Sequence, residues 1–145
     1  MGLDQYLFKV KTDLSAEQIQ TKLKYIEENN ELPEEEVSQQ KCDFLDSIKY
    51  DEIGYWRKHP NLHGCCEDLW YNRGGDGDFN CDYLELTEEN VLEIIKLSKQ
   101  NQLPQTTGFF FGKSTDDDNE YTIEIMEKAL EYIHDGYKIL YYAWW

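Results

Sequence analysis

The chain has 145 residues, of which 40% are hydrophobic and 14% aromatic, a composition that suits one domain with one core and is atypical of a disordered chain. Asp and Glu number 30 against 14 Lys and Arg, which gives a formal net charge of −16. Because such a surface repels phosphate backbones, direct nucleic-acid binding is disfavoured. The acidity indicates either attraction to a basic partner, including mimicry of DNA, or simply a well-solvated surface.

The sequence carries no signal for a membrane or for secretion. No apolar stretch approaches the roughly 18 residues of a membrane span. Residues Met1–Gln5 lack the basic start and apolar run of a secretory signal. We therefore expect a cytoplasmic protein whose cysteines are free thiols in a reducing compartment. The cysteines are Cys42, Cys65, Cys66 and Cys81.

The start of the chain predicts a strand followed by a helix. Side chains alternate in character over 5–11, which is typical of a strand. Ser15 and Gln18 have the spacing of a capping box, and apolar residues follow at helical spacing, so a helix is expected over 15–28. Residues 44–53 fit either a short strand or an irregular turn.

Two polar stretches read as loops. The acidic segment around 27–41 contains Pro33 and predicts an exposed, mobile loop. Residues 72–80 contain three glycines and predict a turn or mobile loop. Between these stretches, Pro60 suits the first turn of a helix that runs to about residue 71.

The second half of the chain predicts further elements that complete a mixed fold. In chain order they are a strand over 81–86, a helix from Thr87 to before Leu103, a buried strand or turn at 108–112, a helix from about 116 that ends at Gly136, and a strand over 137–145. Strands and helices mix without strict alternation. The sequence therefore predicts an α+β fold, with one domain over 1–145 and a small, mostly antiparallel sheet packed with three to four helices.

Rings, cations and imidazoles gather at 55–63, where two of each lie within nine residues of an otherwise acidic chain. Rings stack on a base and Arg grips a phosphate through parallel hydrogen bonds, so the cluster predicts a site for an anionic, nucleotide-like ligand. Three consecutive Phe at 109–111 cannot all face one core from a single strand. The candidate ligand-binding residues are Tyr55, Trp56, Arg57, Lys58, His63 and Phe110. The alternative is that Trp56 anchors the core while Arg57 and Lys58 pair with surface acids.

Weaker patterns indicate metals or a nucleophile. His59 and His63 share a helical face, and together with Cys65 and Cys66 they are weak candidates for a zinc site. Buried inert thiols, or a Cys–His pair beside His63, are the other interpretations. The oxygen-rich segment 76–82 fails the calcium-loop pattern. No cofactor is predicted.

Several segments together resemble a family of uncharacterised proteins of bacteriophages and prophages. The matching segments are Met1–Asp4 with Tyr6, Tyr55–Lys58 with His63, Leu103-Pro104, Gly108–Gly112 and Tyr137–Trp145. The resemblance spans nearly the whole chain in the same order, and the Phe-rich segment is its most specific part. It implies a phage origin and action in a bacterial cytoplasm, and it carries over no activity, cofactor or catalytic residue.

These observations predict a phage-encoded, non-catalytic binding protein that sequesters an anionic, nucleotide-like small molecule in the host cytoplasm. One alternative is an acidic protein–protein inhibitor or DNA mimic of a basic host enzyme, acting through acids such as those of 27–36 and 116–118. The other alternative is a metal-dependent hydrolase that uses clustered Asp and Glu. The expected partner is a host protein or an anionic small molecule, and a homo-oligomer is left open.

Overall fold

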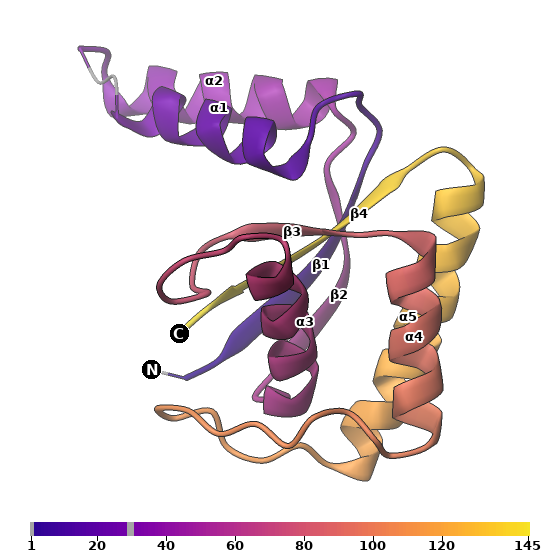
Figure 1. Cartoon of the computed structure of the whole chain (residues 1–145). Coiled ribbons are helices and arrows are strands. Elements are labelled where there is room, and N and C mark those ends of the chain that lie inside the picture. Colours follow the sequence, from indigo (N-terminus) through magenta and orange to yellow (C-terminus); the bar gives the residue numbers. More distant parts are fainter. Residues whose placement is uncertain (1, 29–30) are drawn as a thin grey trace.

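The structure is a computed structural model that describes residues 2–28 and 31–145. Within these ranges it contains one sheet and five helices (Figure 1). The elements are β1 Asp4–Val10, α1 Ala16–Glu28, α2 Glu34–Ser47, β2 Asp51–Arg57, α3 Pro60–Asn72, β3 Tyr83–Leu86, α4 Glu88–Lys99, α5 Asp116–His134 and β4 Lys138–Trp144. The strand order is β2-β1-β4-β3, and every pairing is antiparallel. The predicted α+β fold is confirmed, with one helix more than the expected three to four.

Helices cover the sheet on both faces, because neighbouring residues of a strand point to opposite sides. Leu7 of β1 and Ile139 of β4 belong to a core completed by α3, α4 and α5. Phe8 and Leu140, one residue further along each strand, face a second core formed with α1 and α2. Figure 1 shows the α1–α2 pair lying over one end of the sheet, while both chain termini lie at the other end.

The acidic segment expected to be a loop around 27–41 is largely helical, since α2 begins at Glu34. Pro33 occupies the cap position and three glutamates fill the first turn, where carboxylates are stabilised by the helix dipole. Phe44 and Ile48, four residues apart, supply the buried face. Residues 29–30 of the expected loop lie outside the described residues.

The ambiguous segment 44–53 divides between two elements. Its first residues end α2, and from Asp51 the chain forms β2, an edge strand paired with β1. The segment 108–112 is a turn rather than a strand. Of its rings only Phe111 is buried, at 5% exposure, while Phe109 and Phe110 project into solvent, so the expected burial is wrong for two of the three.

The other predicted helices and strands are confirmed, with small shifts at their ends. The capping box is present at α1, where Ser15 Oγ accepts from the Gln18 backbone N–H and Gln18 Oε1 accepts from the Ser15 backbone N–H. Thr87 and Thr115 form the same arrangement at α4 and α5. Gly136 follows the end of α5 in a left-handed conformation, with φ 91°. None of the described helices has the length and apolar character needed to span a membrane.

Candidate functional site

The residues predicted as a ligand site divide between core and surface. Trp56 is 2% exposed and His63 is fully buried. The Trp56 indole Nε1 donates to Thr122 Oγ1 over 3.0 Å, and the His63 ring stacks on Phe79 with centroids 5.3 Å apart. Neither ring presents a face to solvent. Of the predicted residues, Tyr55, Arg57, Lys58 and Phe110 are the ones that the fold leaves at the surface.

A buried carboxylate orients Arg57. The register of β1 and β2 pairs Asp4 with Arg57, so both side chains lie on one face of the sheet. Asp4 Oδ1 accepts from Arg57 Nη1 over 3.2 Å and from the Tyr55 hydroxyl over 2.5 Å. The bond to Asp4 raises the pKa of Tyr55, which keeps the hydroxyl protonated as a donor. The guanidinium is thus held through Nη1, while the Arg57 side chain as a whole is 53% exposed.

Three chain segments meet beside Arg57 at Gly2. A Cβ built on Gly2 would lie 3.1 Å from Lys58 Cε, 3.3 Å from Arg57 Nη2 and 3.7 Å from the Phe110 carbonyl oxygen. The start of β1, the end of β2 and the 108–112 turn are therefore in contact. Gly2 thus lies between side chains of the end of β2, Arg57 and Lys58, and the Phe110 backbone of the distant 108–112 turn.

Exposed rings surround this junction. Phe109 is 70% exposed, Phe110 53% and Trp144 46%, and Trp144 pairs with Asp4 across the β1–β4 register. We call the surface formed by Tyr55, Arg57, Lys58, Phe109, Phe110 and Trp144 the Arg57 patch. It combines two cations with four rings, and the buried Asp4 carboxylate lies beside Arg57.

A row of tyrosines continues the patch across the sheet. Tyr6 lies opposite Tyr55 on β2 and Tyr142 on β4. The Tyr6 ring centroid is 5.1 Å from that of Tyr55 and 6.4 Å from that of Tyr142. Tyr6 and Tyr142 are half-buried. The open end of the sheet therefore presents a continuous aromatic surface rather than an enclosed cavity.

Two strained residues hold the patch in shape. Lys58 and Phe110 both adopt the left-handed conformation, each with φ 61°, which costs a non-glycine residue roughly 1–2 kcal/mol. Lys58 is fixed by its N–H, which donates to the Leu3 carbonyl over 2.8 Å. Gly112 packs so closely on Lys58 that an added Cβ would lie 3.1 Å from Lys58 Cδ. Such strain persists only where surrounding contacts impose it, and it concentrates at functional sites.

The loop that carries Phe109 and Phe110 is tied to the start of α3. Ser114 Oγ is 2.6 Å from His59 Nδ1 and accepts from the Asn61 N–H over 3.1 Å. The Asn61 side chain accepts from the Thr106 N–H over 3.1 Å. His59 is fully buried, and burial lowers its pKa to about 4. A neutral histidine therefore fastens the far side of the loop.

The weak metal candidates do not gather into a site. Within the described ranges, no three His, Cys, Asp or Glu side chains lie close enough to hold a metal ion. His63 Nδ1 pairs instead with the Tyr141 hydroxyl at 2.8 Å. Burial raises the pKa of Cys65 to about 11 and raises that of the fully buried Cys66 as well, so both are protonated thiols at neutral pH. Cys65 and Cys66 are adjacent on α3 and point in different directions.

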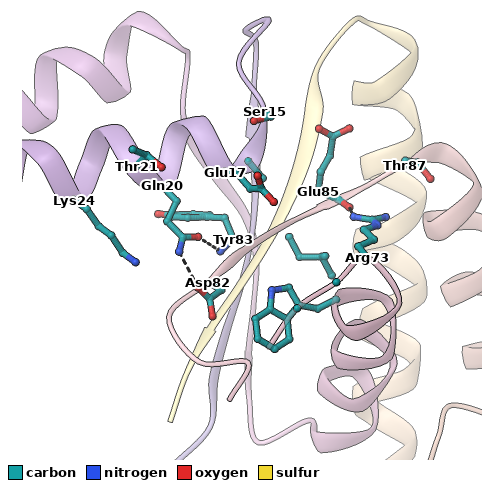
Figure 2. A pocket seen from close by; sticks show the side chains of 15 residues that line it. Ser15, Glu17, Gln20, Thr21, Lys24, Arg73, Asp82, Tyr83, Glu85 and Thr87 are labelled. Carbon is teal, nitrogen blue, oxygen red and sulfur yellow. Dashed lines mark hydrogen bonds between the residues drawn. The ribbon is translucent and has the colours of Figure 1, made fainter. Parts of the chain in front are cut away.

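A separate hollow of about 670 Å³ lies along the outer edge of β3, between α1 and the end of α3 (Figure 2). We call it the β3 groove. Figure 2 shows Gln20 and Lys24 of α1 facing it from one side and Arg73 from the other, with Asp82 and Tyr83 between them. It includes none of the predicted ligand residues. The glycine-rich turn after α3, which the sequence marks only as a loop, forms part of its wall.

A scan against protein-family models, a search of curated proteins and a search of solved structures each found no match to this chain.

Proposed function

We propose that this protein is a non-catalytic binding protein that holds a planar anion, such as a nucleotide, on the Arg57 patch. The observation that carries the proposal is the Asp4–Arg57 pair. A buried carboxylate fixes one nitrogen of the guanidinium, and the Arg57 side chain is 53% exposed. Arginine presents its donors in a planar fork that matches a phosphate, so a fixed guanidinium loses little freedom when the phosphate binds.

The local charge favours an anion even though the whole chain repels one. Arg57 and Lys58 are adjacent, Lys113 follows the Gly112 that packs on Lys58, and none of the described acids forms an ion pair with Lys58 or Lys113. Asp4 balances the charge of Arg57, while Lys58 and Lys113 add positive charge nearby, and charges farther away than a Debye length of about 8 Å are largely screened at physiological salt.

The aromatic surface supplies the second half of the recognition. Tyr55, Phe110 and Trp144 are exposed on the segments that form the patch, and a base that stacks on an exposed ring gains about 1–3 kcal/mol. Stacking tolerates any base. The phosphate contact therefore fixes the position of the ligand, and the ring contact selects for a planar group. Action in a bacterial host cell, which the resemblance to phage proteins implies, belongs to the same proposal.

Titration calorimetry against purine ribonucleoside mono-, di- and triphosphates tests the proposal. We expect at least one of these compounds to bind the wild-type protein. Arg57→Gln should weaken that binding at least tenfold, because a hydrogen bond to a charged group contributes about 1.5–3 kcal/mol. Arg57→Lys keeps the charge without the planar fork, and we expect an intermediate loss.

Lys96→Gln is the matched control. Lys96 is exposed on α4, a helix that lies apart from the two chain termini (Figure 1), and its removal changes the net charge by the same amount. Binding that falls equally in Arg57→Gln and Lys96→Gln would reflect overall charge rather than a site. The absence of heat for every compound at millimolar concentration would rule out the nucleotide version of the proposal.

The sequence leaves two alternatives to this proposal. The acidic-inhibitor hypothesis stays a prediction, although the acids of 34–36 and 116–118 already have a structural role in the first turns of α2 and α5. Capture of a basic host enzyme that is lost on reversing those charges would favour it. The hydrolase hypothesis has no support from a metal-ligand cluster within the described residues.

A further inference from the structure

The outer edge of β3 is the floor of the β3 groove. The strand order makes β3 an edge strand, hydrogen-bonded to β4 on one side only. Its other side faces the hollow between α1 and the turn after α3 (Figure 2). An exposed edge presents unpaired backbone groups that readily accept another strand.

Side chains occupy two backbone groups of this edge. The Tyr83 N–H donates to Gln20 Oε1 over 2.8 Å, and the Glu85 carbonyl accepts from Arg73 Nη1 over 2.6 Å. Because the backbone groups of alternate residues in an antiparallel ladder point to opposite sides, Tyr83 and Glu85 both turn their backbone away from β4. Gln20 and Arg73 therefore close the two ends of the edge.

Among the described residues, one acceptor and one donor remain between these closed ends, the Tyr83 carbonyl and the Glu85 N–H. They flank Leu84, whose own backbone faces β4. A residue of a parallel strand makes this pair of bonds, because it donates to the residue before its neighbour and accepts from the residue after it. An antiparallel strand reaches the same two groups only with two different residues, each making one bond of a pair whose second bond is blocked by Gln20 or Arg73, so the parallel arrangement is the one in which a single residue makes both bonds.

The charges that line the groove favour a basic occupant. The groove contains three acids and two cations, namely Glu17, Asp82, Glu85, Lys24 and Arg73. Arg73 is committed to the Glu85 carbonyl and to Asn90 Oδ1, the latter over 2.7 Å. Neither Glu17 nor Glu85 forms an ion pair with any described residue. The net charge of −16 attracts a cationic segment from a distance.

We propose that the β3 groove binds an extended peptide segment of a partner protein, with basic side chains, that adds to the edge of β3 in parallel orientation. One residue of the segment donates to the Tyr83 carbonyl and accepts from the Glu85 N–H, while its basic neighbours approach Glu17 and Glu85. This inference is independent of the Arg57 patch, which lies at another place on the molecule.

A capped ten-residue peptide of alternating Lys and Val is a suitable probe, because it is extended, basic and periodic. We expect its titration to shift the Glu85 backbone amide in a 1H–15N spectrum and to slow hydrogen exchange there. Glu85→Pro removes the N–H without touching the β4 side of the ladder, since edge strands tolerate proline. It should weaken binding at least tenfold.

Glu85→Gln is the matched control, because it removes the charge and keeps the N–H. It should weaken peptide binding only two- to threefold and make the binding affinity less dependent on salt concentration. If Glu85→Pro does not fold, N-methylation of the peptide at each position in turn gives the same test. At least one N-methyl group should then abolish binding through loss of the donor to Tyr83.

Three results would overturn the proposal: no binding of the peptide at millimolar concentration, equal binding by the wild type and Glu85→Pro, or equal binding of every N-methylated peptide. A concentration-dependent dimer that Glu85→Pro dissolves would assign the groove to a second copy of this chain instead. Nucleotide binding measured on the same Glu85→Pro protein separates the two sites, since the Arg57 patch should be unaffected.

Discussion

Mild acid should destabilise this fold through two buried histidines. Burial lowers the pKa of His59 from 6.5 to about 4, despite the opposing effect of Asp118. Burial does the same to His63, despite a backbone contact with Phe79. Between pH 6.5 and 4 the unfolded chain therefore binds more protons than the folded protein. The free energy of unfolding must fall as the pH is lowered through this window and be fully retained above it.

The magnitude follows from the size of the shift. One pKa unit corresponds to about 1.4 kcal/mol, and pH 5 lies roughly 1.5 units below the unfolded pKa of histidine while the folded residues remain neutral. Each histidine should therefore remove about 2 kcal/mol of stability between pH 7 and pH 5, or about 4 kcal/mol for the pair. This is a large part of the 5–15 kcal/mol that is typical of a folded domain.

Urea unfolding at pH 7, 6 and 5 measures this loss of stability. The His63→Gln variant separates the contribution of His63 from that of the many carboxylates. Glutamine does not titrate and still offers the Tyr141 hydroxyl a hydrogen-bond partner. The variant should lose about 2 kcal/mol less than the wild type between pH 7 and pH 5. Equal losses in the two proteins, or an NMR titration that places His63 near 6.5, would refute the reasoning.

Three further predictions concern caps, packing and thiols. Thr115→Ala removes the acceptor for the first turn of α5 and should lower the free energy of unfolding in urea by about 1 kcal/mol; an unchanged midpoint would contradict this. Gly75→Ala places a Cβ 2.3 Å from the Trp70 ring and should cost about 1–3 kcal/mol, with a change in tryptophan fluorescence; wild-type stability would show that the ring moves freely. A thiol-specific disulfide reagent at pH 8 should label the two exposed cysteines first, the half-buried Cys65 more slowly and the buried Cys66 only after unfolding; labelling of Cys66 in the folded protein would show that its thiol is accessible.

Local periodicity predicted the elements with a strong one-sided pattern. The helices that begin near Ala16, Glu88 and Asp116 combine caps with regular apolar spacing, so local and tertiary preferences agree. α2 was missed because its buried face consists of little more than Phe44 and Ile48, and the acids of its first turn resemble a disordered run. A short amphipathic helix is stabilised mainly by the surface against which it packs, which the sequence does not reveal.

The candidate site shows the same limit. Once β2 is known to extend from Asp51 to Arg57, alternation alone separates Trp56 from Tyr55 and Arg57. Without that strand, the six predicted residues read as one cluster. The approach of Lys58 and Phe110 to Gly2 depends on three distant segments, and the β3 groove depends on how α1, β3 and the turn after α3 pack together. Neither arrangement follows from spacing along the chain.

The most direct test of the account is an NMR map of the nucleotide-binding surface. Adenosine triphosphate titrated into 15N-labelled protein should shift the backbone amides of Arg57, Lys58 and 109–113 and the indole N–H of Trp144, while the β3 groove signals stay unchanged. Shifts confined to the groove around Gln20, or no shifts at millimolar nucleotide, would contradict the claim that the Arg57 patch is a recognition surface.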